Sequence, residues 1–314
     1  MENTSTVTAI ILTAFYEMEK LKYLYFVLFF LLYIIIVVFN FVIIGIICTD
    51  RALHEPMYIF VCNLAFNALY GSTALLPPLL SNLLSPSHEV SLPCCQAQVF
   101  CLHTYAISEF TILAVMGYDR YVAICHPLQY HSMMSVSKVY KLTVFSWVYP
   151  FIAFMIVFAL TLQLILCEKI IDKVYCINYS LVKLSCTDTA IVNIVGLISL
   201  VVYTVPQLVM ILYSYSQILR ICLLSSKEAQ MKALKTCAPH LIAMFNYSIG
   251  CFFEICQNRF NMDYVPYGTR IFMSLYFLIF PPMINPAIYG MSIQAIRVRI
   301  FKLLHRENKL IPTL

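Results

Sequence analysis

The stretch MGYDRYVAIC, Met116 to Cys125, places an acid and a base side by side at the end of a long apolar segment. Asp119 and Arg120 follow residues 90–118, in which Glu109 is the only charged side chain. Another apolar turn follows the pair. Charged groups at the centre of a bilayer are costly, so a charge pair in this position is typical of the edge of a membrane-spanning helix. The pair is therefore a candidate functional site at a membrane surface.

The composition of the whole chain supports membrane insertion. Of its 314 residues, 61% are hydrophobic and 11% are charged, against about 25% charged residues in an ordinary soluble domain. A bilayer core requires about 20 apolar residues per helix, and intervals of this kind recur. We expect an all-α integral membrane protein with a bundle of seven transmembrane helices. The expected spans lie at about residues 23–48, 57–84, 95–122, 142–167, 190–219, 236–256 and 271–291.

The positions of Lys and Arg predict the orientation. Seven spans place the two termini on opposite sides of the membrane. The side that includes the C-terminal tail holds 13 of the 20 Lys and Arg residues, and the other side holds 7. Because cytoplasmic loops carry an excess of these residues, we expect residues 1–22 to be extracellular, residues 23–296 to form the membrane domain and residues 297–314 to be cytoplasmic. The net charge of +5 reflects this asymmetry and does not indicate nucleic acid as a partner.

The C-terminal tail has apolar and basic side chains at helical spacing. Ile296, Ile300, Leu303 and Leu304 share one face, and Arg299, Lys302 and Arg306 take another. This pattern predicts a short amphipathic helix on the anionic cytoplasmic leaflet. The alternative is an ordinary solvated tail.

Five cysteines lie on the expected outer side, where an oxidising compartment permits disulfides. Cys94 and Cys95 open the third span, and Cys167, Cys176 and Cys186 lie in or beside the loop between spans four and five. An odd number leaves one thiol unpaired, and the sequence alone does not fix the connectivity.

Three Asn-X-Ser/Thr sequons occur in the chain. Those at Asn3 and Asn178 lie on the expected outer side and are predicted glycosylation sites. The third, at Asn246, lies inside the sixth span, where the transferase would not reach it.

Two polar side chains in the third span are functional candidates. Glu109 is the only Asp, Glu, Lys or Arg within an expected span and away from its ends, and such groups usually face the bundle interior with a partner. One interpretation is that its carboxyl group makes a structural hydrogen bond. The other is that it binds a cation or acts as a conformational relay. His103, nearer the outer side, contacts either a ligand or a neighbouring side chain.

Motifs along nearly the whole chain point to one family. They are LHEPMYIF at Leu53–Phe60, MGYDRYVAICHPLQY at Met116–Tyr130, Ser214-Tyr215, KALKTCAPHL at Lys232–Leu241 and PPMINPAIY at Pro281–Tyr289. Together they resemble the motifs of the odorant receptors, a family of rhodopsin-like G-protein-coupled receptors.

The resemblance implies roles for individual residues. It implies that a set of residues acts in activation and G-protein coupling, namely Asp119, Arg120, Tyr121, Tyr215, His240, Asn285, Pro286 and Tyr289. It also implies disulfides Cys95–Cys176 and Cys167–Cys186, and a pocket for a small-molecule odorant in the outer half of the bundle. At 1.5 Å per residue, Leu102 lies about 27 Å outward of Arg120. The residues that we expect near the pocket are Leu102, His103, Ala106, Ile107, Ser199, Tyr203, Cys251 and Ile255.

The chain departs from the family pattern at several positions. Ala68, beside Asn67, replaces the aspartate of span two. The sodium site common in these receptors would then keep Glu109 as its only carboxylate. We expect no cofactor other than a possible sodium ion near Glu109. Gly117 replaces an alanine next to the Asp119–Arg120 pair, and Lys235 and Pro239 replace two serines of the span-six motif.

The function that these features predict is that of an odorant receptor in the plasma membrane, in the cilia of sensory neurons. It would bind a small-molecule odorant and activate a heterotrimeric G protein of the stimulatory or olfactory type, which raises cyclic AMP. A non-odorant receptor of the same class remains an alternative. A transporter or channel is disfavoured because no inverted repeat is visible. We do not expect an enzyme, because no histidines in the spans have metal-ligand spacing.

Overall fold

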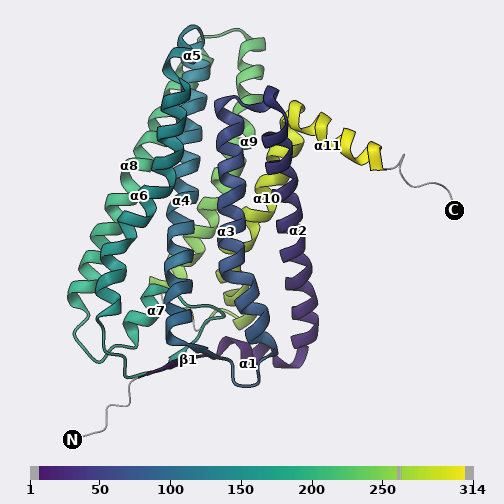
Figure 1. Ribbon diagram of the computed structural model, residues 1–314. Coiled ribbons are helices and arrows are strands. Elements are labelled where there is room, and N and C mark those ends of the chain that lie inside the picture. The colour runs from purple at the N-terminus through teal and green to yellow at the C-terminus, as the bar shows by residue number, and fades with distance from the viewer. Residues whose placement is uncertain (1–6, 260–261, 263, 308–314) are drawn as a thin grey trace, which may run out of the picture.

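Seven long helices form a bundle in which successive helices run in opposite directions (Figure 1). The computed structural model describes residues 7–259, 262 and 264–307. Within these residues the long helices are α2 (Lys22–Thr49), α3 (Pro56–Leu84), α4 (Leu92–Cys125), α6 (Val136–Leu162), α8 (Ala190–Leu223), α9 (Lys227–Arg259) and α10 (Tyr267–Ser292). The predicted seven-helix fold is confirmed.

Short elements connect the long helices or cover their ends. The short α-helices are α1 (Ala14–Met18), α5 (Tyr130–Met133), α7 (Asn178–Lys183) and α11 (Gln294–Glu307). The 3-10 turns are η1 (Glu19–Leu21), η2 (Arg51–Leu53) and η3 (Pro127–Gln129). The strands are β1 (Ala9–Leu12), β2 (Glu89–Ser91) and β3 (Ile170–Ile171).

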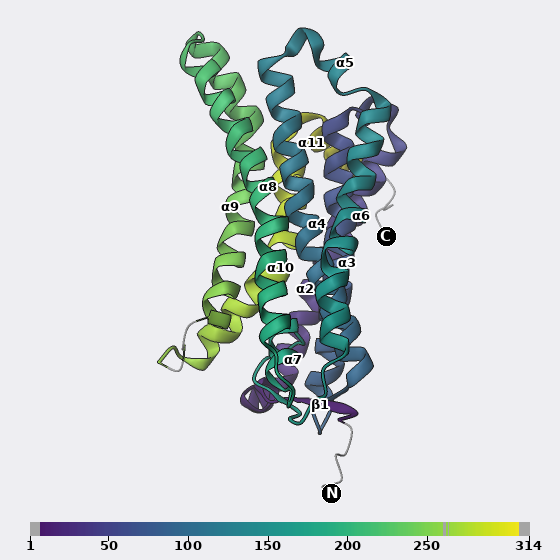
Figure 2. The ribbon, with the colours of Figure 1, turned by 90° about the vertical axis from the view of Figure 1, so that its left-hand side faces the viewer.

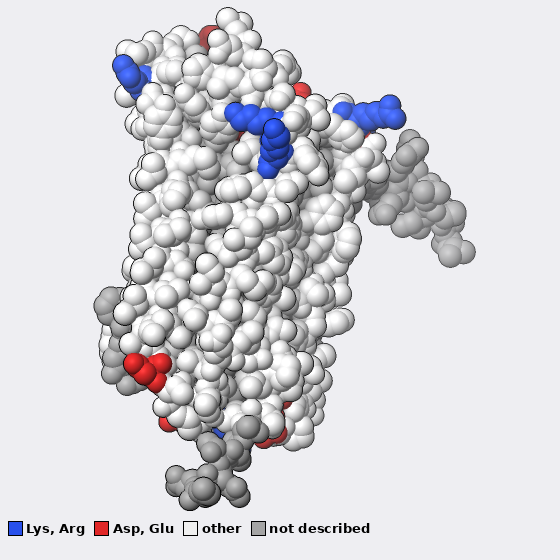
Figure 3. Space-filling view, turned by 60° about the vertical axis from the view of Figure 1, so that its left-hand side comes forward, with Lys and Arg blue, Asp and Glu red and all other residues white. Residues whose placement is uncertain are grey.

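The surface of the bundle is suited to lipid. Six helical segments of the described chain are long and apolar enough to cross a membrane, namely α1 with α2, and α3, α4, α6, α8 and α10. Of the long helices, α9 falls outside this group, and its first turns carry Lys227, Glu228, Lys232 and Lys235. On the face shown in Figure 3, Lys and Arg gather at the upper end and the middle of the molecule is free of charges. The protein is a multi-pass membrane protein.

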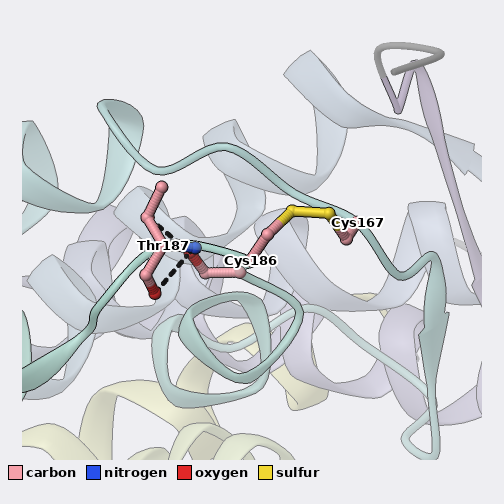
Figure 4. Close-up of a disulfide and its surroundings, with 4 residues drawn as sticks. Cys167, Cys186 and Thr187 are labelled. Carbon is pink, nitrogen blue, oxygen red and sulfur yellow. Dashed lines mark hydrogen bonds between the residues drawn. A yellow bond between two sulfur atoms is a disulfide. The ribbon is translucent and has the colours of Figure 1, made fainter. Parts of the chain in front are cut away.

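The fourth helix differs from its expected span of residues 142–167. α6 ends at Leu162. Beyond it the chain leaves the helix, because Leu166 pairs with Ser185 in an isolated β-bridge and Cys167 is disulfide-bonded to Cys186 (Figure 4). The expected span was too long at this end because the first part of the loop is also uncharged.

A small sheet closes the end of the bundle at which the chain starts. β1 pairs with β2 in antiparallel and with β3 in parallel orientation. Ile10 of β1 and Phe15 of α1 are fully buried. Because both disulfides lie here, we call this the disulfide end, and the opposite one the Arg120 end. The N-terminal segment is thus packed against two loops of the disulfide end (Figures 1 and 2).

The C-terminal helix α11 lies at the Arg120 end and turns away from the bundle axis (Figure 1). Arg299 forms an ion pair with Asp50, which follows α2. The hydrogen bond from Arg299, together with that from the Ala52 backbone N–H, holds the pKa of the Asp50 carboxyl below its ordinary value. Ile296 is fully buried. These contacts join the start of α11 to the bundle, while the side chains of residues 303–307 lie outside the described part.

Candidate functional site

At the Arg120 end, the acid–base pair of α4 is joined by a third residue. Asp119 is fully buried and forms an ion pair with Arg120, whose side chain is 12% exposed. The hydroxyl of Tyr130 donates to the other carboxylate oxygen of Asp119 at 2.8 Å. Charge-assisted hydrogen bonds of this kind are about twice as strong as neutral ones. Asp119, Arg120 and Tyr130 therefore form a latch that fixes the guanidinium against its own helix.

The latch faces an open cavity of about 770 Å³, which we call the inner cavity. Its lining comes from the start of α3, from Arg120, from the first half of α9 and from the junction of α10 with α11. Lys235 and Pro239, the two departures in α9, both line it. Helix α9 thus forms one wall of the inner cavity, and Arg120 of the latch lines it as well.

Two further residues expected to act in activation lie directly against each other. His240 is fully buried, and its Nε2 lies 2.8 Å from the carbonyl oxygen of Leu113. A carbonyl only accepts, so Nε2 donates, and in the neutral ring Nδ1 accepts from the hydroxyl of Tyr215. A Cβ at Gly117 would lie 3.5 Å from His240, which is ordinary van der Waals contact. Gly117 therefore leaves a gap beside His240 that an alanine would fill without strain.

The other expected activation residues are divided between two places. Tyr289 is buried, and its hydroxyl has no hydrogen-bond partner within the described residues. Asn285 and Pro286 lie one turn earlier on α10. Tyr121 lies apart from these, because its hydroxyl is 3.0 Å from His126 and its ring contacts Tyr213 of α8.

Glu109 sits between three helices in the middle of the bundle. The amide of Asn67 on α3 donates to one carboxylate oxygen at 2.7 Å, and the amide of Asn285 on α10 donates to the other at 2.8 Å. All three side chains are buried. As placed, both amides turn N–H groups toward the carboxylate. These N–H groups donate to the carboxylate and offer no oxygen ligand to a cation, so a sodium ion at Glu109 remains a prediction.

A second cavity lies toward the disulfide end, between α4, α8, α9 and α10. Its volume is about 590 Å³, and we call it the outer cavity. Six residues expected near a pocket line it: Leu102, His103, Ala106, Ile107, Tyr203 and Cys251. Ser199 instead lines a smaller neighbouring cavity of about 210 Å³. The side chain of Ile255 lies outside the described part of the chain.

Several lining residues of the outer cavity were not anticipated from the sequence. Tyr175 and Ile177 belong to the loop before α7 and Tyr179 belongs to α7 itself. The position of this segment follows from folding and not from the helical spacing of the spans. Others lie on the helices, namely Phe110, Thr204, Tyr247, Ser248, Glu254 and Phe277. Glu254 follows Cys251 by one helical turn, so i, i+3 spacing could have indicated it.

Disulfides hold the loop over the outer cavity. Cys95 at the start of α4 is bonded to Cys176, and their Cα atoms are 5.4 Å apart. Tyr175, next to this bond, is 1% exposed and donates to Glu254 at 3.1 Å. The bond therefore fixes the loop segment that lines the cavity, while Cys94 is an exposed free cysteine.

Replacing Cys95 with serine is expected to lower the stability of the protein, whereas Cys94→Ser leaves it unchanged. Loss of a native disulfide costs about 2–5 kcal/mol, and the Cys95–Cys176 bond closes a sequence separation of 81 residues. The measurement is surface expression together with the thermal midpoint of the purified protein. Equal losses in the two variants would mean that Cys94 takes part in the pairing.

The glycosylation sequons differ in their surroundings. Asn3 lies outside the described residues. Asn178 begins α7, is half-buried, and has a buried side-chain oxygen without a hydrogen-bond partner in the described structure. Asn246 accepts a hydrogen bond from Tyr276 at 2.7 Å inside the bundle. Glycosylation at Asn3 and Asn178 remains a prediction.

A family model and curated relatives agree on one family, and a solved structure shares the fold. A family model described as olfactory receptor matches residues 29–307. Olfactory receptor 10R2 of Homo sapiens is 33% identical over 312 residues, which cover 98% of this chain and 92% of that protein. Olfactory receptor 5K1 of Homo sapiens is 36% identical over 295 residues, which cover 92% and 94%. The structure of squid rhodopsin matches with a TM-score of 0.71 at 14% identity, covering 94% of this chain and 89% of that one.

Proposed function

This chain belongs to the olfactory receptor family of G-protein-coupled receptors, and from that membership we propose that it binds a small odorant in the outer cavity and activates a stimulatory or olfactory type of G protein. It is a receptor and not an enzyme. In this proposal the disulfide end faces outward and the Arg120 end faces the cytoplasm. In the same proposal the receptor lies in the plasma membrane of sensory cilia.

The observation that carries the proposal is the outer cavity itself. It has about 590 Å³ and lies among apolar and aromatic side chains, with a few polar groups at its edge. Ligand pockets for small molecules have about 300–1,000 Å³ and this kind of lining. Toward the disulfide end it is lined by Tyr175 and Ile177, which flank the disulfide-bonded Cys176.

One helix connects the two cavities. Tyr247 and Cys251 of α9 line the outer cavity, and Lys235 and Pro239 of the same helix line the inner cavity. A ligand shifts a conformational equilibrium only if it binds one state better than the other. An agonist that favours a displaced α9 would widen the inner cavity and free Arg120 from Asp119 to contact the G protein.

The proposal is tested with cells that express the receptor and report cyclic AMP. Volatile and water-soluble small molecules are applied, and cells without the receptor are the control. We expect a response to a subset of small organic compounds. Activation by a peptide hormone alone would indicate a non-odorant receptor, and ligand-dependent current without a G protein would indicate a channel.

Filling the outer cavity is expected to weaken the response to such an agonist. Ala106 lines this cavity, so Ala106→Phe would occupy its space, and the agonist dose–response curve is expected to shift by about tenfold or more, which corresponds to about 1.4 kcal/mol. Ser199→Phe fills only the smaller cavity and serves as the control. Loss of response in the Ser199 variant alone would move the binding site to the smaller cavity.

A further inference from the structure

Three hydroxyl groups that line the outer cavity already donate their hydrogens to the protein. Tyr247 donates to the carbonyl oxygen of Ala106 at 2.7 Å, and Ser248 donates to a carbonyl oxygen of its own helix at 2.8 Å. Tyr175 donates to Glu254 at 3.1 Å. A hydroxyl has one hydrogen and two lone pairs. While these bonds are kept, each of the three hydroxyls can only accept a hydrogen bond from a ligand.

His103 adds a nitrogen acceptor to the same cavity wall. Its Nδ1 lies 2.9 Å from the carbonyl oxygen of Val99, and a carbonyl only accepts, so Nδ1 carries the hydrogen. In the neutral ring Nε2 then has a lone pair. No donor of the described chain is bonded to Nε2, and the ring stacks on Phe154 with the centroids 4.4 Å apart. The ring is therefore held in place while Nε2 remains available to a ligand.

The donors that remain available lie on α8. The hydroxyls of Tyr203 and Thr204 line the outer cavity and are bonded to no residue that the structure describes. Tyr203, like His103, also lines the smaller cavity of about 210 Å³. Neither the Tyr203 hydroxyl nor His103 Nε2 is among the fully enclosed polar atoms that lack a partner. Where the two cavities adjoin, a ligand thus meets one acceptor from α4 and one donor from α8.

The charged residue of the wall is already compensated by the protein. Glu254 lines both cavities, but its carboxylate forms an ion pair with Lys173 at 3.4 Å and accepts a hydrogen bond from Tyr175. Among the described residues, no other Asp, Glu, Lys or Arg side chain lines the outer cavity. The choice between ligand classes therefore falls to the uncharged groups of the wall.

We propose that the outer cavity selects aliphatic alcohols, with His103 Nε2 accepting the hydrogen of the ligand's hydroxyl and the Tyr203 hydroxyl donating to its oxygen. This inference rests on the proposed function, because it names the ligand class of the odorant site. The apolar walls take the hydrocarbon chain. A ketone of the same skeleton accepts from Tyr203 but leaves Nε2 desolvated without a donor, and a site built to bond a ligand hydroxyl rejects an analogue that lacks it.

The experiment compares 2-alkanols with the 2-alkanones of the same carbon skeleton, in a series that includes 2-heptanol and 2-heptanone. The two members of a pair are uncharged and differ only in whether the oxygen can donate. Binding is measured as the thermal shift of the purified full-length receptor against ligand concentration, and cyclic AMP in cells is measured separately. We expect the best alkanol to bind about tenfold more tightly than its ketone.

His103→Phe removes Nε2 and retains a ring that can stack on Phe154. We expect it to weaken alkanol binding about tenfold, which corresponds to about 1.4 kcal/mol, and to leave alkanone binding within about threefold. A merely structural role of His103 would weaken both. The matched control is His54→Phe, because His54 is exposed and lines none of these cavities.

Tyr203→Phe removes the donor and retains the ring. Because alkanols and alkanones both accept a hydrogen bond, we expect this variant to weaken the two classes by similar factors. The pair of variants thus assigns the preference for alcohols to His103. Loss of alkanol binding alone in Tyr203→Phe would contradict this division of roles.

The outcomes separate the ligand class from the receptor function. If no alkanol of the series binds better than its ketone, or if His103→Phe weakens both classes equally, the alcohol proposal is overturned, while odorant responses to other compounds leave the receptor function intact. Alkanol binding that depends on His103 but gives no cyclic AMP response supports the alcohol site and contradicts the proposed signalling function.

Discussion

Replacing Arg120 with alanine is expected to abolish the agonist-stimulated rise in cyclic AMP, although the receptor still reaches the cell surface. Arg120 is held by Asp119 at the wall of the inner cavity, the site proposed for the G protein. Its guanidinium offers five hydrogen-bond donors, and a hydrogen bond to a charged group contributes about 1.5–3 kcal/mol. Without it the proposed active state loses its contact with the G protein. The measurement is the agonist dose–response curve, normalised to surface expression.

The control for this variant is Arg51→Ala, which removes a positive charge at the same end of the bundle. Arg51 is exposed and lies outside the lining of the inner cavity. We expect its response to stay close to that of the unchanged receptor. An unaltered response of Arg120→Ala would refute the assignment of the latch, and loss of surface expression in that variant would indicate a structural role instead.

Replacing Tyr130 with phenylalanine tests the third member of the latch. We expect it to reduce the agonist-stimulated rise in cyclic AMP less than Arg120→Ala does. This change removes the hydroxyl that donates to Asp119 at 2.8 Å and retains the ring. The sequence contains Tyr130 within the quoted motif, but only the folded chain shows that α5 brings this hydroxyl back to the carboxylate. Local motifs thus predicted the acid–base pair, whereas its third member depends on the path of a loop.

The seven-helix fold could be predicted because a bilayer imposes a simple rule on sequence. Each span needs a long interval without charges, and such intervals are visible along the chain. Their ends were less predictable, since uncharged loops such as the one after Leu162 resemble the helices that precede them. Helix α9 shows the opposite difficulty, because it runs from Lys227 to Arg259 and so extends beyond both ends of the expected span 236–256.

The outer cavity was predictable only where helical spacing alone determines which side chains share a face. Leu102 and Ala106 on α4 follow this rule. Tyr175 and Ile177 do not, since the loop that carries them is positioned by the disulfide at Cys176. Ser199 lies on the expected helix, one turn before Tyr203, but lines only the adjacent cavity, whereas Tyr203 lines both.

Replacing Glu109 with leucine is expected to cause a large loss of stability. The amides of Asn67 and Asn285 both donate to this carboxylate inside the bundle. Leucine leaves both without an acceptor, and an unsatisfied buried donor costs about 1–3 kcal/mol. A loss of this size lowers the melting midpoint by about 5 °C or more. The measurement is the thermal midpoint of the purified receptor.

Glu109→Gln distinguishes the two interpretations of this residue. The side-chain oxygens of Asn67 and Asn285 have no hydrogen-bond partners in the described structure. Either amide can therefore turn and accept from the new glutamine, so a structural hydrogen-bonding role predicts a much smaller loss for glutamine than for leucine. A cation site predicts instead that sodium chloride stabilises the unchanged receptor more than choline chloride does, and that Glu109→Gln removes this difference. Equal destabilisation by glutamine and leucine, without a sodium effect, would show that the negative charge itself is required by the three helices.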